Sequence, residues 1–267
     1  MKRIPLITAM MLVLVLTYCQ SESGGSQRSD GEAASSQLAA GSAARKAAAK
    51  AAAAGEDVTF TTSDGVVITG TLYPAGESAP AVLCLHQWRS DRTSFAAIAG
   101  KMQQAGFTVL TIDMRGYGGS TRTEAGKRIR PDRRAQKDIE AALTFLRSQP
   151  SADAGRIGII GASYGSSNAL IHAAKDKGIR ALVLLSPGLN YFNELPTEAP
   201  LKQYGDRPLF AAASTEDLRS VETVEAYRRI APGITVEMYE GAGHGTDILD
   251  AGVGLDAEII AFLKKKL

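Results

Sequence analysis

One short segment of this sequence combines residue types and neighbours that could activate a serine. Residues 161–165, Gly-Ala-Ser-Tyr-Gly, form the pattern G-x-S-x-G, with an apolar strand-like stretch before them and a helix-like stretch after them. A sharp strand-to-helix turn of this kind exposes the serine hydroxyl, and its crowding requires small residues two positions to either side. The helix N-terminus behind the serine favours developing negative charge. The pattern predicts Ser163 as a nucleophile; the alternative is an ordinary glycine-rich turn.

A serine nucleophile needs a base to accept its proton, and the chain offers three histidines, His86, His172 and His244. His172 lies more than two turns along the helix that follows Ser163, and His86 ends a predicted strand. His244 lies in a glycine-rich loop, 241–245, directly after the last predicted strand. Loops at the carboxyl ends of parallel strands build the sites of open α/β sheets. We therefore predict His244 as general base, with a surface-loop histidine as the alternative.

The acid that orients this base should also follow a strand. Asp217 and Glu216 both come just after the apolar stretch 208–214, and Asp247 lies three residues beyond His244. We predict Asp217, with Glu216 as a close rival and Asp247 as a weaker third candidate. A carboxylate that caps a helix N-terminus is the other interpretation of Asp217 or Glu216.

Two backbone N–H groups should stabilise the oxyanion that forms when the serine attacks a carbonyl. Tyr164 would supply one, and Trp88, in the loop after the third predicted strand, would supply the other, with Gln87 as the fallback donor. Trp88 is the only tryptophan. The segment 188–207 carries Tyr191 and Phe192 and is too short for a full cap domain but long enough for a flap. We predict that Gln87, Tyr191 and Phe192 contact substrate in an open, shallow site for short or medium acyl esters.

The pattern of hydrophobic residues predicts an α/β fold. Two strands at 58–62 and 66–73, joined by Ser63-Asp64-Gly65, form a hairpin. Strands and helices then alternate, which is typical of a mostly parallel sheet with helices on both faces. The further strands are expected at 81–86, 107–113, 156–161, 180–185, 208–214 and 234–240, and the helices at 94–106, 132–149, 164–177, 216–230 and 255–266.

These features resemble the α/β-hydrolase superfamily over nearly all of residues 57–267. Residues 113–120 resemble the D-x-R-G-x-G-x-S segment of many members, and the loop around His244 resembles that of small serine esterases related to dienelactone hydrolases. The chain order Ser163, Asp217, His244 is the order of that fold. Gln87 stands where many members carry glycine, and Ser163 stands where true dienelactone hydrolases use cysteine.

The resemblance implies an α/β-hydrolase fold without a full cap domain and a carboxylic-ester hydrolase that uses an acyl-enzyme. It implies no cofactor, and we see no metal-ligand spacing. A serine peptidase on the same fold, or a surface-tethered binding protein without turnover, are the alternatives. The net charge of +2, from 30 basic and 28 acidic residues, gives no reason to expect a nucleic-acid partner. The sequence leaves the oligomeric state open.

The N-terminus has the features of an export signal. Lys2 and Arg3 precede an apolar stretch, 4–17, and residues 16–19, Leu-Thr-Tyr-Cys, resemble the cleavage box of a bacterial lipoprotein, although Tyr18 departs from the usual small residue. We expect a signal peptide at 1–19 with lipidation at Cys19, a flexible tether at 20–56 and the hydrolase domain at 57–267. The protein is then exported and lipid-anchored to a membrane of a bacterial cell envelope; periplasmic or secreted protein is the alternative.

Overall fold

The computed structural model describes residues 55–267, so the expected signal peptide and lipidation site and all but the end of the expected tether lie outside the described residues. Within this range no helix has the length and apolar character needed to cross a membrane. The strands are β1 (Glu56–Thr61), β2 (Val67–Tyr73), β3 (Ala79–Leu85), β4 (Thr108–Ile112), β5 (Ala152–Ala162), β6 (Ile179–Leu185), β7 (Asn190–Tyr191), β8 (Leu195–Pro196), β9 (Leu209–Ser214) and β10 (Thr235–Tyr239). The helices are η1 (Arg92–Phe95), α2 (Ala96–Gln104), α3 (Gln136–Arg147), α4 (Tyr164–Lys175), α5 (Glu198–Tyr204), α6 (Leu218–Ile230), α7 (Asp247–Asp250) and α8 (Leu255–Lys266).

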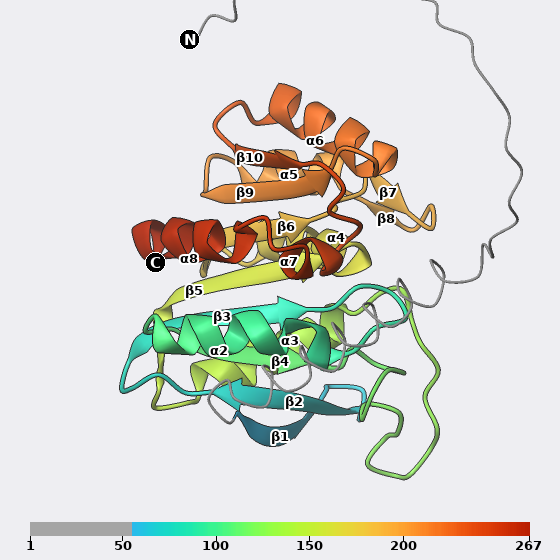
Figure 1. Cartoon of the computed structure of the whole chain (residues 1–267). Coiled ribbons are helices and arrows are strands. Elements are labelled where there is room, and N and C mark those ends of the chain that lie inside the picture. Colours follow the sequence, from blue (N-terminus) through green and yellow to red (C-terminus); the bar gives the residue numbers. More distant parts are fainter. Residues whose placement is uncertain (1–54) are drawn as a thin grey trace, which may run out of the picture. The chain divides into compact units, whose positions relative to one another are not determined.

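Eight of these strands form one sheet in the order β1-β2-β4-β3-β5-β6-β9-β10 (Figure 1). Strand β2 is antiparallel to both of its neighbours. The other neighbouring pairs of this sheet, formed by β4, β3, β5, β6, β9 and β10, are parallel. The chain moves from β3 outward to β4 and then returns to the other side of β3 to form β5. Loops that leave the carboxyl ends of β3 and β5 therefore diverge, which is where open α/β sheets leave a crevice for ligands.

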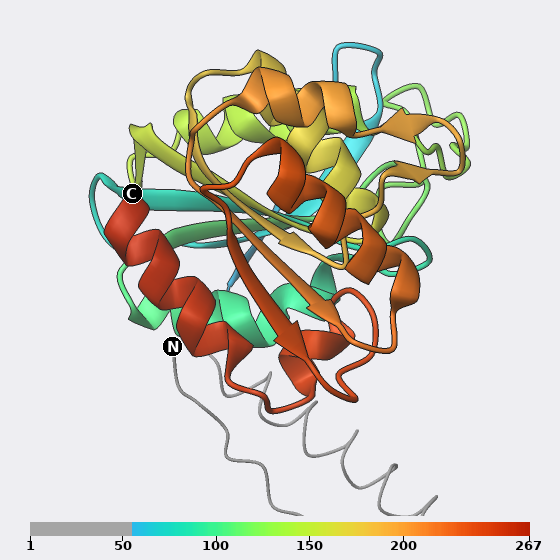
Figure 2. The ribbon, with the colours of Figure 1, turned by 90° about the horizontal axis from the view of Figure 1, so that it is seen from above.

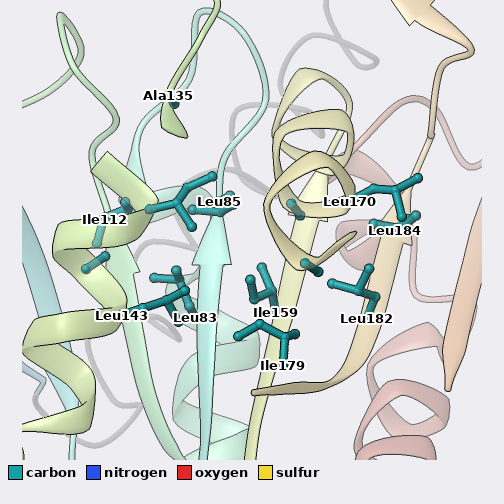
Figure 3. Packing of buried hydrophobic residues seen from close by; sticks show 14 of the residues in the cluster. Leu83, Leu85, Ile112, Ala135, Leu143, Ile159, Leu170, Ile179, Leu182 and Leu184 are labelled. Atoms are coloured by element: carbon teal, nitrogen blue, oxygen red, sulfur yellow. The ribbon is translucent and has the colours of Figure 1, made fainter. Parts of the chain in front are cut away.

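Helices cover both faces of the sheet because residues of the buried strands alternate between two apolar layers. In β3, Leu83 and Leu85 pack into the cluster under α3, α4, α5 and α6, whereas Val82 and Cys84 pack into the cluster under α2 and α8. Figure 2 shows the sheet between these layers. Figure 3 shows side chains of the first cluster, with Leu143 and Leu170 projecting from helices over the strands. The predicted mostly parallel sheet with helices on both faces is confirmed.

Several boundaries differ from the prediction, and local hydrogen bonds explain two of them. The helix expected at 94–106 begins as the 3₁₀ turn η1, where Asp91 accepts the N–H of Thr93. The helix expected at 132–149 begins only at Gln136, because Asn168 of α4 holds the preceding backbone by bonding Ala135 N–H and Arg133 C=O. The flap segment contains three elements that the sequence pattern did not predict, the β7–β8 hairpin and α5.

Candidate active site

Ser163 lies on a strained turn between β5 and α4. Its backbone angles are φ 51° and ψ −120°, outside the regions that serine usually adopts. The turn is held from both sides: Ser163 N–H donates to Leu185 C=O of β6 at 2.8 Å, and Ser163 C=O accepts the N–H of Ser166 at 2.9 Å. A strained backbone of this type costs about 1–3 kcal/mol and persists only when its surroundings fix it. The turn projects the hydroxyl at the carboxyl end of β5, with only 6% of the residue exposed.

The two glycines of the motif are required by close backbone contacts. A Cβ atom on Gly161 would lie 2.5 Å from the carbonyl oxygen of Gly165, and one on Gly165 would lie 2.4 Å from the carbonyl oxygen of Leu85. Side chains almost never come this close to backbone, which cannot move aside cheaply. The glycines therefore let α4 pack directly against the ends of β5 and β3.

We expect Gly165→Ala to lower the free energy of unfolding by about 3 kcal/mol, because the new methyl group would overlap the backbone of Leu85. Gly233→Ala is the matched control, since a Cβ atom there meets nothing within 4 Å. Urea unfolding of both variants beside the parent protein measures the difference. Equal midpoints for the two variants would contradict this explanation of the motif.

His244 connects Ser163 to Asp217 by two short hydrogen bonds. Its Nε2 lies 2.8 Å from Ser163 Oγ, and its Nδ1 lies 2.6 Å from Asp217 Oδ2. Because an ionised carboxylate only accepts, Nδ1 carries the proton and donates to Asp217. The lone pair of Nε2 then accepts the hydroxyl proton of Ser163. The structure thus brings together the three side chains chosen for the triad, each from the end of a different strand.

Asp217 caps helix α6 and contacts the histidine at the same time. Its Oδ2 accepts the hydroxyl of Ser220 at 2.6 Å, and its Oδ1 faces the N–H of Ser220 at 3.4 Å. Burial raises the pKa of the carboxyl, but the hydrogen bonds from Ser220 and His244 outweigh burial, so the net pKa lies below its usual value. The carboxylate is therefore ionised at neutral pH. Asp217 therefore makes the contact of a helix cap, with Ser220, and also the contact with His244 that the acid interpretation requires.

Glu216, the rival acid, holds the histidine loop without touching His244. Its carboxylate accepts the N–H of Gly241 at 2.8 Å and the hydroxyl of Ser214 at 2.5 Å, and Ser214 Oγ in turn accepts the N–H of Ala242. At the other end of the loop, Gly245 N–H donates to Ser186 Oγ at 2.8 Å. The loop is thus fixed through its own N–H groups by side chains from the ends of β6 and β9.

The other candidates lie outside this hydrogen-bonded line. Asp247 begins the short helix α7, and its backbone N–H donates a hydrogen bond to the carbonyl of His244. His172 lies on α4 near Asp176, at 3.9 Å. His86 is fully buried; its Nδ1 faces the carbonyl of Gln87 at 2.7 Å and its Nε2 accepts the N–H of Met114 at 3.0 Å. Burial lowers the pKa of His86, which keeps it neutral, and its two bonds fix the start of the loop after β3.

A cavity of about 370 Å³ opens directly beside Ser163 and His244. Trp88 forms one wall, with its ring centroid 5.0 Å from that of Phe192 and 5.4 Å from that of Tyr164. All three residues predicted to contact substrate line this cavity: Gln87, Tyr191 and Phe192. Gln87 also has a structural contact, because its Oε1 accepts the N–H of Thr246 at 2.7 Å and so connects the β3 loop to the histidine loop.

The two backbone N–H groups predicted for the oxyanion site belong to Trp88 and Tyr164. Within residues 55–267 neither group donates a hydrogen bond to another backbone or side-chain acceptor. Tyr164 is itself fully buried, and its hydroxyl contacts the sulfur of Met114 at 3.2 Å, so its side chain packs in the core while its N–H begins α4. Both amides are thus left available for a ligand atom.

Two residues around the site were not foreseen from the sequence. Ser220 donates its hydroxyl to Asp217. The only sequence signal for this contact was the position of Ser220 near the start of the predicted helix, where serine is common. Arg219 lines the cavity beside Ser163, and nothing in its sequence context distinguishes it from a solvated helix residue. In the described part of the chain, no group of three or more His, Cys, Asp or Glu side chains is arranged to hold a metal ion.

A family model described as alpha/beta hydrolase fold matches residues 80–205, which contain the β3 loop, the serine turn and most of the flap segment. The order of the strands and the turn at Ser163 agree with this match. The chain has the α/β-hydrolase fold. The resemblance expected from the serine motif is thereby confirmed at the level of the fold.

Relatives of this hydrolase-fold chain include two fungal proteins. A polyketide transferase of Aspergillus fumigatus is 32% identical over 137 residues, which are 51% of this chain and 46% of that protein. A thiohydrolase of Aspergillus aculeatus is 29% identical over 170 residues, which are 61% of this chain and 52% of that protein. The chain therefore spans about half the length of the curated relatives it matches.

Solved structures share the fold at low sequence identity. An alpha/beta hydrolase from Penicillium sp. superposes with a TM-score of 0.66 at 18% identity, over 79% of this chain and 98% of that chain. An esterase from Pyrococcus furiosus superposes with a TM-score of 0.63 at 19% identity, over 79% of this chain and 91% of that chain. At such identities the likeness extends to the fold alone.

Proposed function

We propose that the protein is a serine hydrolase that cleaves carboxylic esters with short or medium acyl groups. The observation that carries this proposal is the line of hydrogen bonds from Ser163 Oγ through His244 to Asp217, which ends in an open cavity. A serine hydroxyl becomes a nucleophile only beside such an oriented base.

In the proposed reaction, Ser163 Oγ attacks the ester carbonyl while His244 Nε2 takes the hydroxyl proton. Asp217 stabilises the imidazolium that forms, and the N–H groups of Trp88 and Tyr164 bind the oxyanion. The tetrahedral intermediate collapses when His244 returns the proton to the leaving alkoxide, which departs as an alcohol. Water then attacks the carbonyl of the acyl-enzyme while His244 takes a proton from it. His244 returns this proton to Ser163 Oγ, and the carboxylic acid is released.

The flap supports a preference for short or medium acyl groups. Only the two-residue strands β7 and β8 and the seven-residue helix α5 stand between β6 and β9, so no cap domain encloses a long chain. The cavity of about 370 Å³ is bounded by the rings of Trp88, Tyr191 and Phe192. These rings offer apolar contact for a few methylene groups, each worth about 0.8 kcal/mol when buried.

A thioester is the second candidate substrate, since the relatives include fungal proteins named thiohydrolase and polyketide transferase. The same attack on a thioester carbonyl would expel a thiolate, which leaves more readily than an alkoxide and needs less help from the proton on His244. The acyl-enzyme would be the same. Only the leaving group distinguishes the two candidates.

The test uses the protein from Asp57 onward, beside its Ser163→Ala variant. We expect a fluorophosphonate probe to label the parent protein on the peptide that contains Ser163 and to leave the variant unlabelled. We expect Ser163-dependent release of p-nitrophenol from acetate and butyrate esters, falling towards palmitate. An N-acetylcysteamine thioester of the same acyl group compares the two leaving groups. An unlabelled parent protein, or turnover that persists in the variant, would contradict the proposal.

A further inference from the structure

A second cavity lies next to the cavity that contains Ser163 and His244. The second cavity has a volume of about 590 Å³ and lies between the β7–β8 hairpin and helix α6. Three residues line both cavities, Tyr191, Phe192 and Arg219. The two cavities therefore meet at these residues, next to the place where an acyl chain bonded to Ser163 would lie.

Arg219 brings a positive charge to the place where the two cavities meet. Among the described residues, its guanidinium forms no ion pair and no hydrogen bond. Two other arginines are paired: Arg133 with Glu194 at 2.6 Å and Arg228 with Glu225 at 2.9 Å. Because Arg219 is exposed at the junction of the two cavities, its five N–H donors are free to receive an anion.

The backbone of Arg219 is fixed to the flap. Thr223 donates its hydroxyl to the carbonyl of Arg219 at 2.8 Å and accepts the N–H of Leu189 at 3.1 Å. The turn of α6 that carries Arg219 is thus bonded to the flap segment.

One acidic residue lines the second cavity, Glu222, which lies one turn after Arg219 on α6. It forms no ion pair with Arg219 within the described residues. Its charge partly offsets that of Arg219 at this rim, because the two groups share the same cavity. The rest of the lining offers neutral hydrogen-bonding groups from Asn190, Asn193 and Thr223.

We infer that the second cavity is a subsite for an anionic group of the substrate, and that Arg219 selects esters whose acyl chain ends in a carboxylate. The inference rests on the proposed hydrolase function and specifies its substrate class. The ester carbonyl lies at Ser163, the methylene chain passes Tyr191 and Phe192, and the terminal carboxylate binds Arg219. A planar guanidinium matches a carboxylate with two parallel hydrogen bonds.

The experiment compares mono-p-nitrophenyl esters of adipic and suberic acid with p-nitrophenyl hexanoate and octanoate. Shorter dicarboxylic monoesters are avoided because they hydrolyse by attack of their own carboxylate. We expect Arg219→Gln to lower the ratio of kcat/KM for anionic over neutral esters by about tenfold, and salt to weaken the preference. Glu222→Gln should raise the ratio, and Arg228→Gln, with the same loss of charge farther along α6, should leave it unchanged.

A binding measurement separates this inference from the proposed chemistry. Calorimetric titration of Ser163→Ala with monomethyl suberate should show binding that Arg219→Gln in the same background weakens about tenfold. Equal ratios for the parent, Arg219→Gln and Arg228→Gln, with turnover that depends on Ser163, would overturn the subsite and leave the hydrolase intact. Binding that depends on Arg219 without turnover of any ester would support the subsite and overturn the hydrolase.

Discussion

Ser163→Ala and His244→Ala are each expected to lower kcat for a p-nitrophenyl ester by about 10⁴- to 10⁶-fold, and the double variant by no more than the larger single loss. The reason is that the two side chains act as one unit through the bond of 2.8 Å between Ser163 Oγ and His244 Nε2. Without the hydroxyl there is nothing to deprotonate, and without the imidazole the hydroxyl stays a weak nucleophile. Steady-state kinetics of the three variants measures this coupling.

His172→Ala is the control for these losses. His172 lies on α4, outside the cavity beside Ser163, and its nearest acidic partner is Asp176 at 3.9 Å. We expect its kcat to stay within about twofold of the parent value, because no proton transfer passes through it. Losses that multiply in the Ser163–His244 double variant would show that the two residues act independently, and the triad interpretation would be wrong.

Asp217→Asn is expected to lower kcat by about 10³- to 10⁴-fold while the free energy of unfolding changes by less than about 0.5 kcal/mol. Asparagine caps a helix as well as aspartate does, with its oxygen towards the N–H of Ser220. The amide NH₂ group then occupies the position of Oδ2, which faces His244 Nδ1. That nitrogen must accept instead of donate, so Nε2 carries the proton and cannot take another from Ser163.

Two further variants separate the roles of the neighbouring carboxylates. Asp217→Ala loses both the cap and the charge, so its stability should also fall, by about 1 kcal/mol. Glu216→Gln keeps an acceptor for the N–H of Gly241 and should lose far less activity than Asp217→Asn. Chemical unfolding and kinetics on the same preparations test the pair. A larger loss of kcat in Glu216→Gln than in Asp217→Asn would reverse the assignment.

The sequence predicted the sheet and the triad candidates because both depend on strongly patterned segments. Each candidate follows an apolar strand, and parallel strands bring their carboxyl ends to one edge. The sequence favoured Asp217 over Glu216 only narrowly, since two adjacent residues both follow the strand and their side chains point in different directions. Here the helix cap turns Asp217 towards His244, and Glu216 turns towards the loop backbone.

The secondary structure of the flap and the second cavity could not be predicted from the sequence, for a different reason. Strands β7 and β8 are two residues long, too short for any alternation to show, and α5 is only seven residues long with a proline, Pro200, in its first turn. Phe192 and Asn193, at the hairpin turn, both have positive φ, a conformation that the phenylalanine gives no reason to expect. Arg219 lines the cavities together with residues of this hairpin, so its place could not be foreseen without the hairpin.

Trp88 gives the protein a built-in optical reporter of its own site. It is the only tryptophan in the chain, so all indole emission comes from one residue, and that residue forms a wall of the cavity next to Ser163. Its ring is in contact distance of Phe192 at the tip of the flap hairpin. Ligand entry or displacement of the hairpin would change the surroundings of this single fluorophore, so occupancy can be followed in real time without any label or chromogenic substrate.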